Sequence, residues 1–310
     1  QIQSTNPCGE LPLLPWESCN LGSLNLSRFV ADGAILWPAL AAATRWAVRL
    51  LDDVIDATSF PLAPVADATR ATRKIGLGVM GFADLLVELG VPYHAPEALD
   101  VADRVMGFVA RHSRAASEAL GEARGPFPAF AGSRVAERGE PARRNATTTT
   151  IAPTGTLSLL AGCSAGIEPL FAPAYERRFL DGRQATEVHP LFRRRLAERG
   201  LDDDERLTAV ARAGTARVDG VPDDLARLFV TAHEVDPRHH VAMQAAFQRH
   251  CDASISKTIN FPNSASVEDV KQIYELAIDE GVKGVTVYRD GCRDVQPMSL
   301  KNSGKKEPAP

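Results

Sequence analysis

The segment KTINFPNSASVEDVKQIYELAIDEGVKGVTVYRDG, residues 257–291, decides the fold of this chain. Its first residues, Lys257–Phe261, form a short β-branched and aromatic run that predicts a strand. Ser266, followed three residues later by Asp269, is typical of a helix start. Residues 284–288 predict a second strand. A strand, a helix and a strand in this order form the unit of a parallel sheet or barrel, so we expect an α/β fold. The apolar residues of the helix are expected to point inward: Val267, Val270, Ile273, Tyr274, Ala277 and Ile278.

The rest of the chain fits the same α/β plan. Thr147–Ile151 is a β-branched run that predicts a buried strand. Apolar spacing and proline or glycine ends predict helices over residues 38–57, 75–89, 96–123 and 237–251. On the first of these helices, the side expected to face the core comprises Leu36, Leu40, Trp46, Leu50, Leu51, Val54 and Ile55.

A single domain is expected over residues 1–298. Within it, residues 178–235 are rich in Arg, Asp and Glu and predict short helices at the periphery. Residues 299–310 are polar and poor in apolar side chains, which predicts a disordered tail. The chain opens on Gln1 rather than on a start methionine or a signal segment, so we expect a piece of a longer chain.

The composition is that of a globular protein that buries a core, with 45% hydrophobic and 24% charged residues. No stretch approaches the ~20 uninterrupted apolar residues of a membrane span. A net charge of −4 and a pI of about 6.0 argue against an electrostatic grip on nucleic acid. Five cysteines are too few for a disulfide scaffold and suit a reducing cytoplasm, where we expect this protein to act without a membrane or nucleic-acid partner.

The strongest chemical pattern is a loop near the start of the chain: Asn6, Pro7, Cys8, Gly9 and Glu10. On an extended loop, alternate positions would point the Asn6 amide, the Cys8 sulfur and the Glu10 carboxylate to one side. These groups would offer a reactive sulfur, a hydrogen-bonding amide and a general base to one small substrate. Cys19 is a candidate second redox sulfur. The alternative is that Cys8 and Cys19 are ordinary buried thiols and Glu10 is a surface carboxylate.

A second candidate site follows the predicted strand at 147–151 and consists of Pro153, Thr154, Gly155, Thr156 and Leu157. Backbone N–H groups at a helix start, together with two hydroxyls, can bind a phosphate without a lysine. Gly155 would let the backbone approach that phosphate closely. The alternative is a plain turn after a strand. The segment lacks the lysine-containing pattern of a P-loop nucleotidase.

The remaining patterns point to neither a metal nor a dinucleotide. The histidines at 233, 239, 240 and 250 are not spaced so that two of them would share one face of a helix as metal ligands. No closely spaced pair of cysteines is present to complete a zinc site. The glycines at 76, 78 and 81 lack the strand-to-helix context of a dinucleotide fold, which argues against NAD. The other cysteines, interpreted as packing or surface thiols, are Cys163, Cys251 and Cys292.

Five stretches, in order along the chain, resemble the large chain of ribonucleotide reductases, most closely the adenosylcobalamin-dependent class II family. They are residues 6–10 with 17–23, 76–84, 145–158 with 162–169, 256–262, and 283–291. Residues 178–235 contribute little to the resemblance. It implies part of the ribonucleotide reductase-type α/β barrel, with the cysteine loop as an internal finger.

The resemblance also implies an activity, the reduction of ribonucleoside diphosphates to 2′-deoxyribonucleoside diphosphates by a thiyl radical. Cys8 resembles the cysteine that takes the 3′ hydrogen of the ribose. Glu10 resembles the base that removes the 3′-hydroxyl proton, and Asn6 the amide that binds the substrate hydroxyls. Cys19 resembles one half of the redox pair that supplies electrons as the 2′-hydroxyl leaves. Residues 153–157 resemble the loop that holds the substrate phosphate.

Several partners follow from the same resemblance. Adenosylcobalamin is the expected cofactor, and a thioredoxin-like or other dithiol is the expected reductant. An N-terminal half, which carries the second redox cysteine in the family, is expected from outside this chain. A homodimer is one expected assembly of the complete protein. Whether the chain acts alone, needs that half, or is a non-catalytic fragment that binds it stays open.

Tyr288 bears on the source of the radical. Family large chains that receive their radical from a separate iron protein carry two adjacent tyrosines late in the barrel. Here Tyr288 stands between Val287 and Arg289. This favours radical generation at the cysteine by adenosylcobalamin, with the iron-dependent class I family as the alternative.

Overall fold

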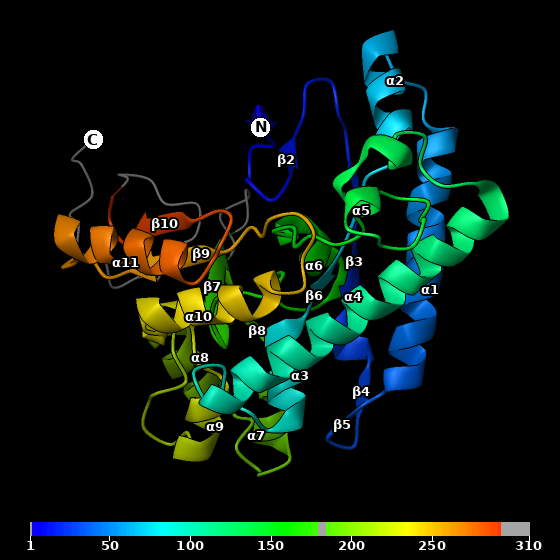
Figure 1. Cartoon of the computed structure of the whole chain (residues 1–310). Helices are drawn as coiled ribbons and strands as arrows, with labels where there is room; N and C mark the ends of the chain where they lie inside the picture. Colours follow the sequence, from blue (N-terminus) through cyan, green and yellow to red (C-terminus); the bar gives the residue numbers. More distant parts are fainter. Residues whose placement is uncertain (1, 179–183, 293–310) are drawn as a thin grey trace.

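The computed structural model describes residues 2–178 and 184–292, and Figure 1 shows them as mixed helices and strands. The strands are β1 (Ser4–Thr5), β2 (Pro12–Leu13), β3 (Asn20–Asn25), β4 (Val30–Ala31), β5 (Ala34–Ile35), β6 (Ile75–Met80), β7 (Ala174–Arg178), β8 (Gln184–Val188), β9 (Thr258–Phe261) and β10 (Thr286–Arg289). The helices are α1 (Trp37–Ala57), α2 (Ala63–Thr72), α3 (Phe82–Leu89), α4 (Pro96–Arg124), α5 (Arg134–Glu137), α6 (Gly155–Ala161), α7 (Pro190–Ala197), α8 (Asp204–Ala213), α9 (Asp223–Leu228), α10 (Pro237–Gln248) and α11 (Val267–Asp279).

Parallel strand pairing forms the centre of the structure. β3 pairs with β6 in parallel, Asn20 opposite Ile75. Residues 147–151 continue the arrangement through parallel bridges from Thr149 to Leu77 of β6 and from Ile151 to Ile255. β9 and β10 form a second parallel pair, connected by α11. The strand, helix and strand expected over 257–291 are therefore confirmed. The strand expected over 147–151 is present only in part, as an extended run beside β6 that pairs through isolated bridges.

The helix expected over residues 75–89 is wrong in its first half. Residues 75–80 form the fully buried strand β6, and the helix α3 begins only at Phe82. The glycines explain the difference. A Cβ atom on Gly78 would lie 2.2 Å from the carbonyl oxygen of Thr150, so this strand needs a glycine to approach its neighbour. An apolar run with closely spaced glycines is thus a close-packed strand here.

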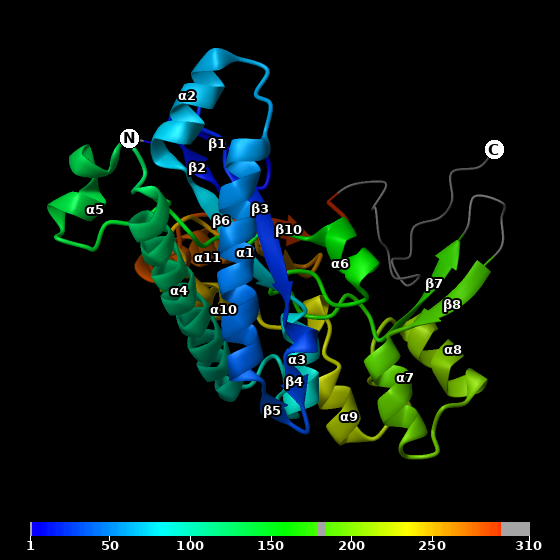
Figure 2. The ribbon, with the colours of Figure 1, turned by 90° about the vertical axis from the view of Figure 1, so that its right-hand side faces the viewer.

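Long helices cover the parallel strands. Figure 2 shows α1 and α4 running side by side, and α1 packs on β3 and β6 while α10 packs on α4 and β9. The helices expected over 38–57, 96–123 and 237–251 are confirmed within a few residues at their ends. No helix of the described part of the chain is long and apolar enough to span a membrane.

Two predicted apolar stripes are only partly correct. On α1, the buried positions include Leu40, Leu51 and Ile55, whereas Trp46 and Leu50 are exposed. On α11, Ile273 and Ala277 are buried, but the side chains of Val267, Tyr274 and Ile278 are exposed. Apolar spacing alone assigned too wide a face to each helix, because it does not show which apolar positions a neighbouring element covers.

The part of the molecule that follows α6 departs from expectation in one element. Residues 178–235 do contain the short helices α7, α8 and α9, but they also contain β8, which pairs with β7 in an antiparallel hairpin. Figure 2 shows this hairpin with α7 and α8 at one side of the molecule. The tail expected to be disordered, residues 299–310, lies outside the described residues. The described strands do not close into a barrel, so the structure shows the α/β character and the parallel core rather than a complete barrel.

Candidate active site

The loop from Asn6 to Glu10 is a tight turn. The backbone N–H of Gly9 donates to the carbonyl oxygen of Asn6 at 3.0 Å, and the N–H of Leu11 donates to Asn6 Oδ1 at 3.0 Å. The expectation of an extended loop with three side chains on one side is therefore wrong, because the turn sends Cys8 outward and Glu10 inward. Cys8 is exposed, and Glu10 is 2% exposed.

This turn is anchored against the parallel core. The carbonyl oxygen of Glu10 accepts the N–H of Ser254 at 2.9 Å and the hydroxyl of Thr150 at 3.0 Å. Gly284 lies beside the same place, since a Cβ atom there would be 2.9 Å from Ser254 Oγ and 3.6 Å from the Gly9 carbonyl oxygen. Three distant parts of the chain thus meet at the turn. The expectation of an internal finger is not met by the described residues, because their strands enclose no barrel and Cys8 is exposed.

One oxygen of the Glu10 carboxylate is buried without a hydrogen bond from the described part of the chain. Its Oε2 atom is buried and has no partner among the described residues, and the buried hydroxyl of Ser254 shares this condition. Buried polar atoms are nearly always paired in native structures, and an unpaired one is destabilising. A carboxylate kept in this state can accept a proton from a bound molecule.

Cys19 ends the loop that precedes β3, and its thiol is free and partly buried. Burial raises its pKa to about 12; the Lys74 ammonium acts in the opposite direction, and the carboxylates of Glu17 and Glu10 raise the pKa further. Lys74 Nζ donates to Glu17 Oε2 at 2.6 Å. The thiol therefore stays neutral, beside an ion pair that sequence patterns did not reveal.

The predicted phosphate segment forms the first turn of α6. Thr154 precedes the helix in a left-handed conformation with φ of 54°, and its hydroxyl oxygen accepts the N–H of Gly166 at 2.7 Å instead of capping the helix. Gly155, Thr156 and Leu157 are exposed. An uncapped first turn leaves backbone N–H groups without acceptors inside the helix. The residue in the unusual backbone conformation is Thr154, whereas Gly155 is simply open to its surroundings.

A buried set of polar side chains backs this segment. Glu168 accepts Lys257 Nζ at 2.7 Å and the N–H of Thr258 at 2.6 Å. The hydroxyl of Tyr93 donates to the carbonyl oxygen of Ile167 at 2.6 Å. Gly166 donates to Thr154, and the next two residues are also fixed: Ile167 by Tyr93, and Glu168 by Lys257 and by Thr258 of β9. Residues 162–169 carry part of the family resemblance, but no sequence pattern predicts a role for Glu168.

His240 completes this set of polar side chains as a partner of Lys257. Its Nδ1 atom lies 2.7 Å from Lys257 Nζ, and burial, followed by the Lys257 charge, lowers its pKa to about 2. It is therefore a neutral hydrogen-bond partner of the lysine. In the described part of the chain, no group of three or more His, Cys, Asp or Glu side chains is arranged to hold a metal ion.

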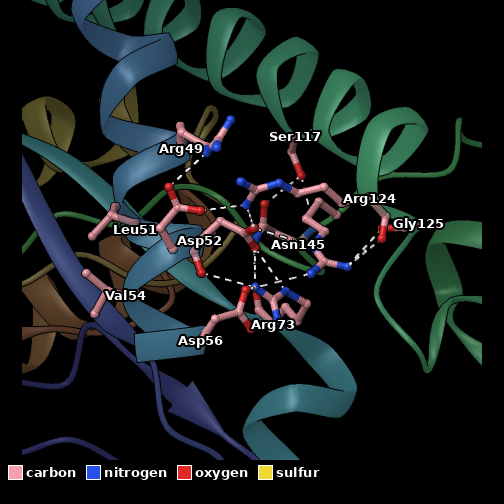
Figure 3. Close-up of polar contacts among 12 residues, drawn as sticks. Arg49, Leu51, Asp52, Val54, Asp56, Arg73, Ser117, Arg124, Gly125 and Asn145 are labelled. Atoms are coloured by element: carbon pink, nitrogen blue, oxygen red, sulfur yellow. Dashed lines mark hydrogen bonds and ion pairs between the residues drawn. The ribbon is translucent and has the colours of Figure 1, made fainter. Parts of the chain in front are cut away.

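A separate ionic cluster centred on Asp52 holds the start of the extended run that leads to α6 (Figure 3). Asp52 is fully buried. Its Oδ1 atom accepts Arg73 Nε at 2.9 Å and Asn145 Nδ2 at 3.0 Å, and its Oδ2 atom accepts from Arg144 at 3.3 Å and from Arg124 at 3.4 Å. Asn145 Nδ2 also donates to the Arg73 carbonyl oxygen at 2.9 Å. The cluster ties α1, α4 and residues 143–145 together.

These groups define what the site can do. The parallel core joins the elements that carry four kinds of group. They are the exposed thiol of Cys8, the buried carboxylate of Glu10, the thiol of Cys19 beside an ion pair, and the backbone N–H groups in the first turn of α6. Thiols donate hydrogen atoms or electrons, a carboxylate accepts a proton, and N–H groups bind an anion. The set suits a substrate that carries hydroxyls and a phosphate.

Comparison with known proteins gives a consistent result. The family model described as "Ribonucleotide reductase, barrel domain" matches residues 1–143 and 139–288. A vitamin B12-dependent ribonucleoside-diphosphate reductase of Thermoplasma acidophilum is 50% identical over 308 residues, which cover 99% of this chain and 40% of the relative. A reductase of the same name from Mycobacterium tuberculosis is 50% identical over 300 residues, 96% of this chain and 43% of the relative. The chain thus spans about 40% of the length of these relatives.

More distant proteins share the fold. The α subunit of the class Id ribonucleotide reductase of Actinobacillus ureae superposes with a TM-score of 0.79 at 22% sequence identity, over 94% of this chain and 54% of that subunit. A ribonucleoside-diphosphate reductase subunit alpha of Chlamydia pneumoniae is 27% identical over 97% of this chain and 34% of its own length. Similarity is therefore considerably higher to the proteins named as vitamin B12-dependent diphosphate reductases.

Proposed function

Because this chain belongs to the ribonucleotide reductase barrel-domain family, we propose that it carries the catalytic site of an adenosylcobalamin-dependent ribonucleoside-diphosphate reductase. The enzyme would convert ribonucleoside diphosphates to 2′-deoxyribonucleoside diphosphates for DNA synthesis. The names of the relatives at 50% identity support both the diphosphate substrate and the cofactor. Because the relatives at 50% identity are named as vitamin B12-dependent, their similarity favours this proposal over the iron-dependent alternative.

One observation carries the proposal: Glu10 is buried with an unpaired carboxylate oxygen, two residues from the exposed Cys8. The Glu10 carboxylate also raises the pKa of the second thiol, Cys19, after the larger effects of burial, Lys74 and Glu17. A base, a radical-forming sulfur and a reducing sulfur are the three functions that the reaction needs around one ribose.

In the first part of the proposed reaction, the Cys8 thiyl radical takes the hydrogen atom from the ribose 3′ carbon. Glu10 accepts the proton of the 3′ hydroxyl, which its unpaired Oε2 atom can do without first breaking a hydrogen bond. Asn6 Oδ1 is engaged by the Leu11 N–H, so the Asn6 amide NH₂ is the group available to bind the substrate hydroxyls.

In the second part, the 2′ hydroxyl leaves as water. Two electrons and two protons come from Cys19 and a second thiol, which become a disulfide, and the 2′ carbon gains a hydrogen. The 3′ hydrogen then returns from Cys8 to the ribose, which regenerates the thiyl radical. Each turnover therefore consumes one dithiol, and a separate reductant of the thioredoxin-like or small dithiol class restores Cys19.

The described residues fit the proposed cofactor at Cys8. The thiol lies on an exposed turn, so a group as large as adenosylcobalamin can approach its sulfur. When bound, adenosylcobalamin supplies the carbon radical that removes the hydrogen atom from a thiol. Tyr288 has Val287 and Arg289 as neighbours, so no pair of adjacent tyrosines is present to relay a radical from another protein.

The substrate phosphates are assigned to the first turn of α6. The exposed backbone of Gly155, Thr156 and Leu157 supports this, as does the rigid backing of Thr154 through Gly166. Pro153 precedes the left-handed Thr154 and completes the turn. Because no lysine or arginine lies in the segment, backbone geometry is expected to matter more than side-chain charge.

Two further partners belong to the proposal. The remaining part of the large chain, as found in the longer relatives, is proposed to supply the second redox cysteine. A homodimer is proposed for the complete protein.

The test uses a completed enzyme, in which this chain is joined to the rest of the Thermoplasma acidophilum relative. It is assayed with a ribonucleoside diphosphate, adenosylcobalamin and a dithiol, and the product is followed by chromatography. We expect 2′-deoxyribonucleoside diphosphate, and none from a Cys8→Ser variant. Product that forms only with a di-iron partner subunit would establish the class I alternative. Absence of product under both conditions would show that the chain is a non-catalytic partner of the remaining half.

A further inference from the structure

Lys74 lies next to Cys19 because of the register of two strands. Cys19 directly precedes β3 and Lys74 directly precedes β6, and the parallel pairing sets Asn20 opposite Ile75. The residues one step earlier, Cys19 and Lys74, are therefore neighbours at the amino ends of the two strands, where adjacent strands are about 4.8 Å apart.

The Lys74 ammonium is fixed in this position. Its Nζ atom donates to Glu17 Oε2 at 2.6 Å, and the same oxygen accepts the N–H of Leu14 at 2.8 Å. The Glu17 side chain is 2% exposed and that of Lys74 is 17% exposed. An ion pair this well shielded is screened little by salt, so its field acts on nearby groups.

The Cys19 sulfur lies beside Gly76 on the same side. A Cβ atom at Gly76 would lie 3.5 Å from Cys19 Sγ and 2.6 Å from side-chain atoms of both Leu21 and Thr150. The sulfur thus lies against the backbone of β6 at Gly76, which is two residues after Lys74.

The charged groups that act on Cys19 are Lys74, Glu17 and Glu10. After burial, which disfavours the thiolate, Lys74 has the largest effect and lowers the pKa of Cys19, while the two carboxylates raise it. Without Lys74, a Cys19 thiolate would be destabilised both by burial and by the negative charges of Glu17 and Glu10. Of these three groups, Lys74 is therefore the one that favours a Cys19 thiolate, although burial keeps the resting thiol neutral.

A Cys19 thiolate is required at one point of the proposed cycle. When a dithiol attacks the partner sulfur of the Cys19 disulfide, the S–S bond breaks and Cys19 leaves with the electron pair, after which a proton restores the thiol. Leaving sulfurs of lower pKa depart faster in this exchange. We propose that Lys74, held by Glu17, stabilises Cys19 as the leaving thiolate and sets the rate at which the enzyme is re-reduced. This inference rests on the proposed function.

The first test measures Cys19 on this chain without any catalysis. Wild type, Lys74→Met and Lys74→Arg are treated with iodoacetamide between pH 8 and 10, and alkylation of each cysteine is followed by peptide mass spectrometry. We expect Cys19 to react about 3- to 10-fold more slowly in Lys74→Met, since one pKa unit is a factor of ten. Lys74→Arg should react like wild type, and the exposed Cys292 should react equally in all three.

A double variant guards against unfolding caused by a lone buried carboxylate. Lys74→Met with Glu17→Gln removes both charges and leaves an uncharged pair of similar shape. Because Lys74 acts on Cys19 more strongly than Glu17 does, Cys19 should still react more slowly than in wild type. Alkylation of Cys19 at the wild-type rate in both folded variants would overturn the proposal.

The second test uses the completed enzyme. Lys74→Met should slow multiple turnovers with a dithiol by about 3- to 10-fold, in step with thiolate formation. A single turnover of pre-reduced enzyme should stay at the wild-type rate, and Lys74→Arg should restore multiple turnover. Equal slowing of single and multiple turnover would overturn the proposed step. Absence of product from the wild type would instead refute the proposed function, while the alkylation rates would still report on Lys74.

Discussion

Two buried carboxylates in this molecule have opposite surroundings. Asp52, fully buried, accepts hydrogen bonds from Arg73, Asn145, Arg124 and Arg144. Glu10 is equally withdrawn from water, but its Oε2 atom has no partner in the described part of the chain. A structural carboxylate is saturated because an uncompensated buried charge is strongly destabilising. A carboxylate left unpaired is available to a ligand, and the difference between these two separates the scaffold from the site.

The largest expected effect is that of Glu10→Gln on catalysis. The substitution keeps the shape and removes the base, so kcat of the completed enzyme should fall by about 10²–10⁴-fold. Since no hydrogen bond to Oε2 is lost and an uncompensated buried charge is removed, this chain should be no less stable to unfolding than wild type. Steady-state kinetics and urea unfolding measure the two quantities. A large loss of stability with normal kcat would make Glu10 a structural residue.

Asp52→Asn should show the reverse. The substitution removes the buried negative charge that Arg73, Arg124 and Arg144 share, and we expect a loss of about 3–5 kcal/mol in the free energy of unfolding. The matched control is Asp53→Asn on the next residue of α1, where the carboxylate is 45% exposed and its ion pairs contribute less than about 1 kcal/mol. Equal destabilisation by the two variants, measured by urea unfolding, would remove the distinction between scaffold and site.

The phosphate segment gives a smaller effect, on substrate binding. A Cβ atom at Gly155 would meet no atom within 4 Å, so Gly155→Val should leave the fold intact. It should nevertheless raise KM for the diphosphate by about tenfold, because a side chain there blocks approach to the backbone N–H groups and forfeits one or two hydrogen bonds. Thr156→Ala should change binding by about 1 kcal/mol for one hydroxyl. Cofactor binding should be unaffected by either. A normal KM in Gly155→Val would place the phosphate elsewhere.

Local patterns in the sequence predicted much of this fold. The extended run at 147–151, the pair β9 and β10 with α11 between them, and the helices α1, α4 and α10 follow from β-branched runs, caps and apolar spacing. β6 was missed because its glycines serve a close approach to Thr150, which is 70 residues or more away along the chain. The exposed faces of α1 and α11 were assigned to the core because spacing does not reveal which neighbour covers a helix.

The candidate site was predicted to a similar extent. Residues 6–10, Cys19 and 153–157 were identified from motifs, although their roles remain predictions. The supporting pairs were not found: Lys74 with Glu17, Lys257 with Glu168, and Arg73 with Asp52 join residues 21 to 89 positions apart. An ion pair between distant segments leaves no periodic or local signal in one sequence, so only the fold shows it.

The most direct test of the central claim follows the fate of the 5′ hydrogen of adenosylcobalamin in the completed enzyme. With tritium at that carbon, release of the label to water reports hydrogen transfer through the radical cysteine, separately from substrate reduction. We predict that Cys8→Ser abolishes both label release and deoxynucleotide formation. Cys19→Ser should still release label, yet fail to sustain multiple turnovers with a dithiol. Label release at the wild-type rate by Cys8→Ser would contradict the assignment of the radical to Cys8 and, with it, the proposed mechanism.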